Sequence, residues 1–225
     1  SDVYKRQIRN TQIGEVSYQD EGSIPLDSVI RYNTLFIPRG GEYQITLADG
    51  TKVWMNSDSK LIFPVRFPGN KREVILEGEA YFEVAHDTTR PFYVKACGID
   101  IRATGTAFNV MAYGNEPECK VTLVEGGVNI EKNEFLISQL TPRIQFCIDL
   151  KTQEYKTCEV DLRVSIAWKD GIFFFEQESF RSIIAKLSRW YDITIVCNTP
   201  DLYDYRFSGE IRKYENVLKV LDMLK

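Results

Sequence analysis

Hydrophobic and polar residues alternate with a period of two along the stretch from Arg72 to Tyr113. Such alternation is typical of strands with one buried face and one solvated face. In its first part, the buried face is expected to carry Val74, Leu76, Gly78, Ala80, Phe82 and Val84, and the solvated face Glu73, Ile75, Glu77, Glu79, Tyr81 and Glu83. Shorter alternating runs follow, separated by turn residues. The stretch therefore predicts a series of short strands.

The same strand pattern extends over residues 34–150. Asp49-Gly50 lies between two such runs and is a strong hairpin signal. Short strands at regular spacing, without a helical period, predict an all-β unit that is a sandwich, a prism or a short coil of strands. Residues 1–33 are polar and weakly periodic, so we expect a lead-in segment with one edge strand near Ile13–Tyr18.

The pattern changes near Asp161. Apolar residues from Phe180 to Tyr191 recur at helical spacing after Ser179, the expected N-cap, and a second helical stripe runs from Val217 to Leu224. The runs expected as strands are Ile166–Trp168, Ile172–Phe175, Ile193–Val196 and Tyr205–Glu210. The order β–β–α–β–β–α predicts a small α+β domain over residues 165–225, joined by a linker or edge strand at 151–164. The predicted fold class is therefore mainly β.

Composition limits the classes of partner. The chain has 225 residues, of which 44% are hydrophobic and 12% aromatic, enough for a folded core. The formal net charge is −4 and no block of lysine and arginine stands out, which argues against nucleic-acid binding. The sequence contains no apolar run of membrane-spanning length and no apolar signal-peptide core. A fragment of a longer membrane protein would have the same features.

Candidate catalytic and metal-binding residues are few. His86 is the only histidine and follows a strand run, so we expect a turn residue rather than a base or a ligand. Four glutamates on one face of the central strand lie side by side and are expected to be solvated rather than to converge on an ion. They are Glu73, Glu77, Glu79 and Glu83. Asp49-Gly50-Thr51 is a loop, and no glycine-rich phosphate loop occurs. We therefore expect no enzymatic activity, no cofactor and no metal.

Five cysteines are scattered along the chain without metal-ligand spacing. Cys119, Cys158 and Cys197 are in register with the apolar faces of their expected strands, so we expect them to be buried. Cys97 and Cys147 fall on the opposite register, which indicates exposure. Disulfide formation stays open, because the sequence does not show the geometry that it requires.

Four strings carry a family resemblance: LADGTKVWMNSDSKLIFP (47–64), GEAYFEVAHD (78–87), PFYV (91–94) and GTAFNVMAY (105–113). They resemble the FecR family of bacterial anti-sigma regulators. The resemblance implies a module that senses events at the outer membrane and relays them across the inner membrane. It also implies a periplasmic domain of a single-pass inner-membrane protein. The transmembrane helix, and a cytoplasmic segment that binds an ECF sigma factor, would precede Ser1.

Three C-terminal strings look like the C-terminal domain of Bacteroidetes-type FecR proteins: WKDGIFFFEQESF (168–180), LSRWYDITI (187–195) and RFSGEIRKYENVLKVLDML (206–224). That domain is similar in layout to the short N-terminal domain of secretins and signal-transducing transporters. The implied partner is the periplasmic signalling domain of a TonB-dependent outer-membrane transporter, of the glycan-importing kind. We expect this partner to bind by strand addition at an open sheet edge. Family members continue into a closing strand pair and this chain stops at Lys225, so either the tail is truncated or disordered, or one sheet edge is unpaired.

Aromatic residues and arginines concentrate binding energy at interfaces, and both are frequent in the C-terminal unit. The expected partner-binding residues are Arg181, Arg189, Trp190, Tyr205, Arg206 and Phe207. Two alternatives stay open. One is a carbohydrate-binding β module, for which Trp54 is the only tryptophan within residues 34–150. The other is a hydrolase, for which no nucleophile, histidine and acid can be assembled convincingly.

Overall fold

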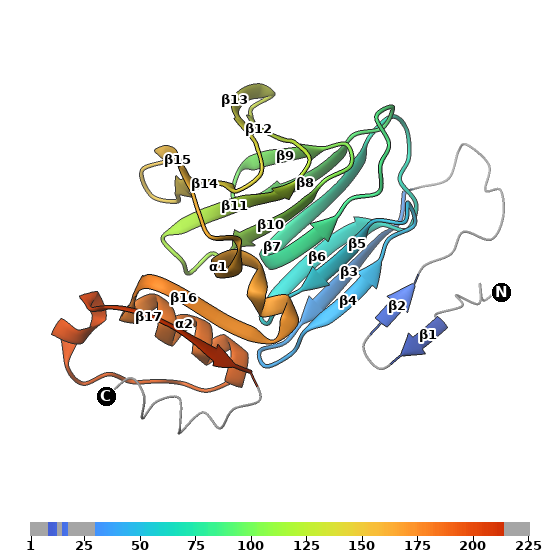
Figure 1. The fold of residues 1–225 in the computed structure, drawn as a ribbon. Coiled ribbons are helices and arrows are strands. Elements are labelled where there is room, and N and C mark those ends of the chain that lie inside the picture. Colours follow the sequence, from blue (N-terminus) through green and yellow to red (C-terminus); the bar gives the residue numbers. More distant parts are fainter. Residues whose placement is uncertain (1–8, 13–14, 18–29, 214–225) are drawn as a thin grey trace.

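The computed structural model describes residues 9–12, 15–17 and 30–213 (Figure 1). Its first fifteen strands belong to one sheet. They are β1 (Arg9–Gln12), β2 (Glu15–Ser17), β3 (Tyr32–Ile37), β4 (Tyr43–Thr46), β5 (Lys52–Met55), β6 (Ser59–Pro64), β7 (Arg72–Glu83), β8 (Phe92–Ala96), β9 (Ile99–Ala103), β10 (Ala107–Ala112), β11 (Glu118–Glu125), β12 (Val128–Lys132), β13 (Phe135–Leu140), β14 (Ile144–Asp149) and β15 (Tyr155–Glu159). The predicted mainly β fold is confirmed.

Six further elements follow the sheet. They are α1 (Leu162–Ile166), the 3-10 helix η1 (Ala167–Asp170), β16 (Ile172–Ser179), α2 (Phe180–Tyr191), the 3-10 helix η2 (Pro200–Asp204) and β17 (Arg206–Arg212). β16 and β17 form a separate antiparallel pair. We call the segment 162–213 the cap, because it packs on the outer face of the sheet (Figure 1). No helix in the described ranges is both long and apolar enough to cross a membrane.

Strand β7 is shared by the two halves of the sheet. Its first part pairs with β6 and β8, and its second part pairs with β5 and β10. The exchange of partners occurs at Gly78, whose φ of +99° is a conformation that residues with a Cβ rarely adopt. One half of the sheet continues from β7 to β15, and the other continues from β7 to β13. The sheet is therefore curled around a common strand.

The two halves of the sheet enclose one hydrophobic core. The rings of Phe82 and Phe108 stack in one half with their centroids 5.2 Å apart, and the centroid of Phe92 in the other half lies 6.2 Å from that of Phe82. All three side chains are fully buried. Of the three predicted architectures, this arrangement is closest to the sandwich, because two stretches of sheet face each other across the core.

A buried ion pair holds the predicted β4–β5 hairpin against the start of β7. Asp49 accepts a hydrogen bond from the Thr51 hydroxyl at 2.7 Å, which closes the Asp-Gly loop. Arg72 donates from Nη1 to Oδ2 of Asp49, also at 2.7 Å, and from Nε to the carbonyl of Arg90 at 2.8 Å. The hairpin is confirmed, and its aspartate also neutralises a buried guanidinium.

The solvated face predicted for β7 is solvated only in part. Glu77 and Glu83 are exposed, but Glu79 is 9% and Tyr81 5% exposed. The prediction is wrong for Glu79 and for Tyr81, because the cap covers the second part of the strand (Figure 1). Alternation shows which residues share a face, but it does not show what covers that face.

The burial of the cysteines differs from the prediction. Cys119 is buried as expected, but Cys158 is exposed because β15 is an exposed edge strand, and Cys197 is half-buried. Cys147 is buried, not exposed, and its thiol donates to Oε1 of Gln145 at 3.3 Å. Cys97 is half-buried, and all five thiols are free.

Two predicted strands of the C-terminal unit are absent from the structure. Residues 166–168 are helical, because Asp161 caps α1 through the N–H of Arg163 and Gly171 ends η1 in the left-handed conformation. Residues 193–196 form no strand, and the carbonyl of Ile193 accepts from Arg39 Nη2 at 2.8 Å. Three or four apolar residues are too few to establish a period.

The other elements of the C-terminal unit agree with the sequence where the structure describes them. Helix α2 begins after Ser179, whose side chain accepts from the N–H of Ser182, and β16 and β17 coincide with two predicted strands. The helix predicted at Val217–Leu224 lies outside the described residues. At the other end, β2 lies within the edge strand predicted near Ile13–Tyr18 and pairs with β4.

Candidate functional site

The cap and the sheet share a second hydrophobic cluster. Tyr81 of β7 is its buried member from the sheet, and Trp54 of β5 packs against it with its ring edge-on to Tyr81 at 5.6 Å. The buried members from the cap are Trp168, Phe173, Phe175, Ile183, Leu187, Trp190 and Ile211. Because aromatic rings bury large apolar areas, this contact fastens the cap to the sheet.

A buried chain of hydrogen bonds lies within this contact, centred on Glu79. Oε2 of Glu79 accepts from Nδ2 of Asn56 at 2.8 Å, and Oε1 accepts from Nδ2 of Asn109 at 2.9 Å. The amide oxygen of Asn56 accepts from the indole N–H of Trp190 at 3.0 Å. The amide oxygen of Asn109 accepts from the indole N–H of Trp168 at 3.2 Å. We call these five residues the carboxylate relay.

The direction of every bond in the relay follows from the two indoles. An indole N–H can only donate, so each asparagine must present its oxygen to tryptophan and its NH2 group to Glu79. Glu79 must then accept on both oxygens, which an ionised carboxylate does. Burial raises the pKa of Glu79, whereas the two amide bonds and the charges of Lys186 and Arg189 oppose that rise. The relay joins the sheet to the cap through one buried charge.

Polar contacts at the end of α2 add to the attachment. Arg189 Nη2 pairs with Glu116 Oε1 at 2.7 Å, and its guanidinium lies 4.0 Å from the centroid of the Tyr113 ring. The backbone N–H of Gly40 donates to the carbonyl of Arg189 at 2.7 Å. Arg39 Nη2 donates to the carbonyl of Ser188 at 2.7 Å. The loop between β3 and β4 and the loop between β10 and β11 thus both hold the helix.

Burial under the cap should make Tyr81 a source of alkaline instability. Burial, with the charges of Glu83 and Glu125, raises the pKa of Tyr81 to about 12. Since the pKa is higher in the folded state, the stabilisation is complete below pH 10 and is lost as the pH rises from 10 toward 12. We expect the free energy of unfolding to fall between pH 9 and 11.5 by about 1–2 kcal/mol more in the natural chain than in Tyr81→Phe. Urea denaturation of both proteins at the two pH values checks this. An equal fall in the free energy of unfolding for the natural chain and for Tyr81→Phe would contradict it.

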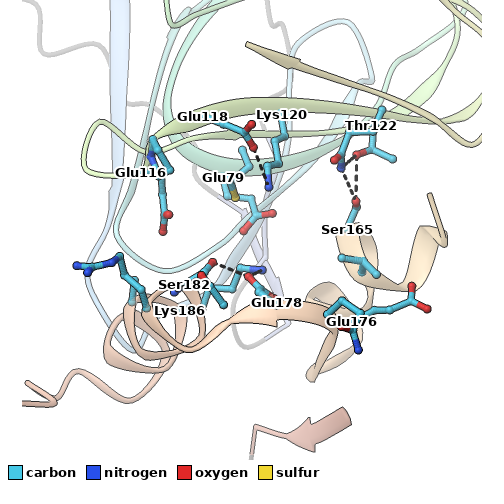
Figure 2. Close-up of a pocket in the computed structure, with 18 of the residues that line it drawn as sticks. Glu79, Glu116, Glu118, Lys120, Thr122, Ser165, Glu176, Glu178, Ser182 and Lys186 are labelled. Atoms are coloured by element: carbon cyan, nitrogen blue, oxygen red, sulfur yellow. Dashed lines mark hydrogen bonds and ion pairs between the residues drawn. The ribbon is translucent and has the colours of Figure 1, made fainter. Parts of the chain in front are cut away.

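A cleft of about 520 Å³ opens beside the relay, where the cap meets β11 and β14 (Figure 2). Its sheet wall includes Thr122 and Gln145, and Gln145 Nε2 donates to the Thr122 hydroxyl at 2.8 Å. On the cap wall, Lys186 Nζ lies 2.6 Å from Oε1 of Glu178. Glu79 lies between the two walls in Figure 2. The volume is in the range of sites that hold small ligands or a few residues of a peptide.

The predicted partner-binding residues divide into two groups. Arg189 and Trp190 are 5% and 6% exposed and contact the sheet, so in this structure they hold the cap in place. Arg181 and Arg206 both line the cleft and are exposed. Tyr205 is exposed, and Phe207 is half-buried against Phe180. Partner binding by these residues stays a prediction, and the structure places Arg181 and Arg206 in the lining of the same cleft.

No cluster of histidine, cysteine and acidic side chains suited to a metal ion occurs in the described part of the chain. His86 is exposed and lies over Gly105, where an added Cβ would come within 2.3 Å of Nδ1. The histidine therefore covers a glycine turn.

The sequence reasoning missed the relay. Glu79 was expected among solvated glutamates, and Asn56 and Asn109 were not singled out. The available signal was the odd position of Asn109, a polar residue in the apolar run Phe108 to Ala112. A buried amide requires partners, but only the tertiary structure shows that they are Glu79 and Trp168.

Comparisons with known proteins agree with this architecture. The family model for the FecR protein matches residues 33–129, and the model for the FecR C-terminal region matches residues 172–225. A crystal structure of a proposed anti-sigma factor from Parabacteroides distasonis ATCC 8503 at 1.65 Å resolution is 29% identical, with a TM-score of 0.80, over 85% of this chain and 90% of that chain. A second such structure from the same organism, at 2.50 Å, is 28% identical, with a TM-score of 0.80, over 86% and 90%. A search of curated proteins finds no significant match. The chain therefore belongs to the FecR family and has the regulatory signalling role of an anti-sigma factor.

Proposed function

We propose that this chain is the periplasmic, signal-receiving part of a transmembrane anti-sigma factor. The cap recognises the periplasmic signalling domain of a TonB-dependent outer-membrane transporter, and the sheet is a rigid spacer that carries the cap. An ECF sigma factor is bound by a cytoplasmic segment outside this sequence, beyond one transmembrane helix. Membership of the FecR family supports a regulatory role rather than catalysis.

The observation that carries the proposal is the edge of β17. Within the described residues, β17 pairs with β16 and with no other strand. Such an edge offers unpaired N–H and C=O groups to an incoming strand. Tyr205, just before the strand, is 60% exposed, and Arg206 at its start is also exposed. The cap is held by its buried face, and within the described residues no other strand occupies this edge.

A partner strand on this edge changes the orientation of the cap relative to the sheet. The relay and Arg189 connect the two parts. Binding then favours those states of the chain in which the cap is oriented for signalling, as in any population shift by a ligand. The membrane-proximal part of the anti-sigma factor responds by proteolysis or by release of the sigma factor.

Amide hydrogen exchange with and without the partner tests strand addition. The probe is the N-terminal signalling domain of the transporter encoded beside this chain, with the corresponding domain of an unrelated transporter as the control. We expect exchange across Arg206–Arg212 to slow by about tenfold or more on binding. An edge strand of the large sheet, β15, provides the internal control, and its exchange should be unchanged. Absence of binding in calorimetry would contradict the proposed function.

No observation favours the carbohydrate-binding alternative. Trp54 would have to provide a flat platform for a sugar ring, but it is half-buried and packs edge-on against Tyr81 in the contact between sheet and cap.

A further inference from the structure

The charged residues that line the cleft beside the relay are mostly paired with one another. Glu178 pairs with Lys186, and Glu118 pairs with Lys120 at 3.4 Å. Glu116 pairs with Arg189, and Glu79 is held by the two asparagines of the relay. These groups have little capacity left for a partner, because their strongest electrostatic interactions are satisfied within the chain.

Arg181 and Arg206 differ from the other cations that line the cleft. In the part of the chain that the structure describes, no carboxylate lies within ion-pair distance of either guanidinium. Arg181 comes from the start of α2 and Arg206 from the start of β17, and both are exposed. Each of these two exposed guanidiniums can bind a carboxylate of a partner.

Both arginines are held in position by contacts that leave donors free. The guanidinium of Arg181 lies 4.5 Å from the centroid of the Tyr203 ring. Nη1 of Arg206 donates to the carbonyl of Gln177 at 2.7 Å. A guanidinium has five N–H donors, so each retains a set that can bind a carboxylate in bidentate fashion. Holding the side chains in advance reduces the entropy that binding must offset.

A β-bulge in β16 lies next to Arg206 at the cleft. β16 has a bulge between Phe175 and Glu178, and Gln177 within it has a φ of +46°. The N–H of Gln177 donates to the hydroxyl of Ser208 at 2.9 Å, so the bulge is held by β17. Bulges of this kind redirect the chain next to functional sites. Here the bulge directs the Gln177 carbonyl toward Arg206.

We propose that the opening of this cleft binds an acidic segment of the partner protein, with Arg181 and Arg206 each taking a carboxylate. The inference rests on the proposed function. It specifies which part of the cap recognises the partner and which side chains bind it. Arg206 is the first residue of β17, so a strand added to that edge can continue directly into the cleft. Glu176, an exposed carboxylate on the same bulge, also lines the cleft, and the nearby positive charge of Arg163 partly offsets its repulsion of an acidic segment.

Charge reversal at both arginines tests the inference. The variant R181E/R206E and the natural chain are titrated with the neighbouring transporter's signalling domain by calorimetry at 50 and 300 mM NaCl. We expect the double variant to bind at least about tenfold more weakly at low salt and to lose most of the salt dependence. Arg143→Glu is the control, because Arg143 is an exposed arginine that lies outside β17 and does not line the cleft. It should stay within about threefold of the natural chain.

The outcomes separate the two proposals. If the natural chain does not bind, the proposed function fails. If the natural chain binds and R181E/R206E binds within threefold of it, or if Arg143→Glu weakens binding as much as the double variant, the assignment of the cleft is overturned. R181Q/R206Q, which removes the charges without reversing them, should give an intermediate affinity. Unchanged thermal melting of each variant shows that the fold is intact.

Discussion

Replacing Glu79 by glutamine is expected to lower the free energy of unfolding by about 2–4 kcal/mol, although the two side chains have nearly the same shape. Glutamine has one oxygen and one NH2 group, so only one end can accept from an asparagine. The other end places a donor against Nδ2 of Asn56 or Asn109. If that asparagine turns, its Nδ2 meets the indole N–H of Trp190 or Trp168 instead. Either way, a buried donor loses its acceptor.

Urea denaturation followed by tryptophan fluorescence measures this effect, because two of the three tryptophans belong to the relay. Glu77→Gln is the matched control. Glu77 lies two residues earlier on the same face of β7, its side chain is 64% exposed, and it pairs with Lys60 at 2.7 Å. Its loss should cost less than about 1 kcal/mol. Equal stabilities of the two variants would show that the relay does not hold the cap.

Gly78→Ala should have an effect of similar or greater size, about 2–5 kcal/mol. A Cβ at this position would come within 2.3 Å of Oγ and 2.6 Å of Cα of Ser59. Because Cα belongs to the backbone of β6, the clash cannot be relieved by a rotamer change alone. The φ of +99° adds conformational strain for any residue with a Cβ. The position where β7 changes partners therefore requires glycine.

Gly69→Ala separates these two causes. Gly69 also has a positive φ, +67°, but an added Cβ would meet nothing within 4 Å. It should cost only about 1–2 kcal/mol, the contribution of the left-handed conformation. Thermal or chemical denaturation of both variants gives the comparison. If Gly78→Ala were no more destabilising than Gly69→Ala, the close contact with Ser59 would not limit the fold.

The sequence pattern was sufficient to predict those elements whose conformation depends on residues close in sequence. The strand β7, the Asp49-Gly50 hairpin and the Ser179 cap of α2 were all predicted correctly, since each depends on residues close in sequence. Prediction was wrong at Ile166–Trp168 and Ile193–Val196. These runs are short and apolar, and their conformation depends on caps and on contacts with distant residues such as Arg39.

The candidate site could be predicted only in outline. Arg181 and Arg206 were named from composition, and the structure places both at one cleft. Arg189 and Trp190 were named on the same grounds and are instead buried against the sheet. Composition indicates which residues can bind a protein surface, but it does not distinguish a surface of a partner from a surface of the same chain.

The sequence by itself determined that this protein is a mainly β chain of short strands followed by a mixed α+β segment, because side-chain alternation, turns and caps act over a few residues. Only the tertiary structure decided that the cap lies on the outer face of β7, that Glu79 is buried between two asparagines, and that Arg181 and Arg206 share an opening. These features depend on residues 23 to 134 positions apart, such as Glu79 with Asn56 and Trp190 with Asn56. Their proximity is set by the packing of the whole sheet and not by any local preference.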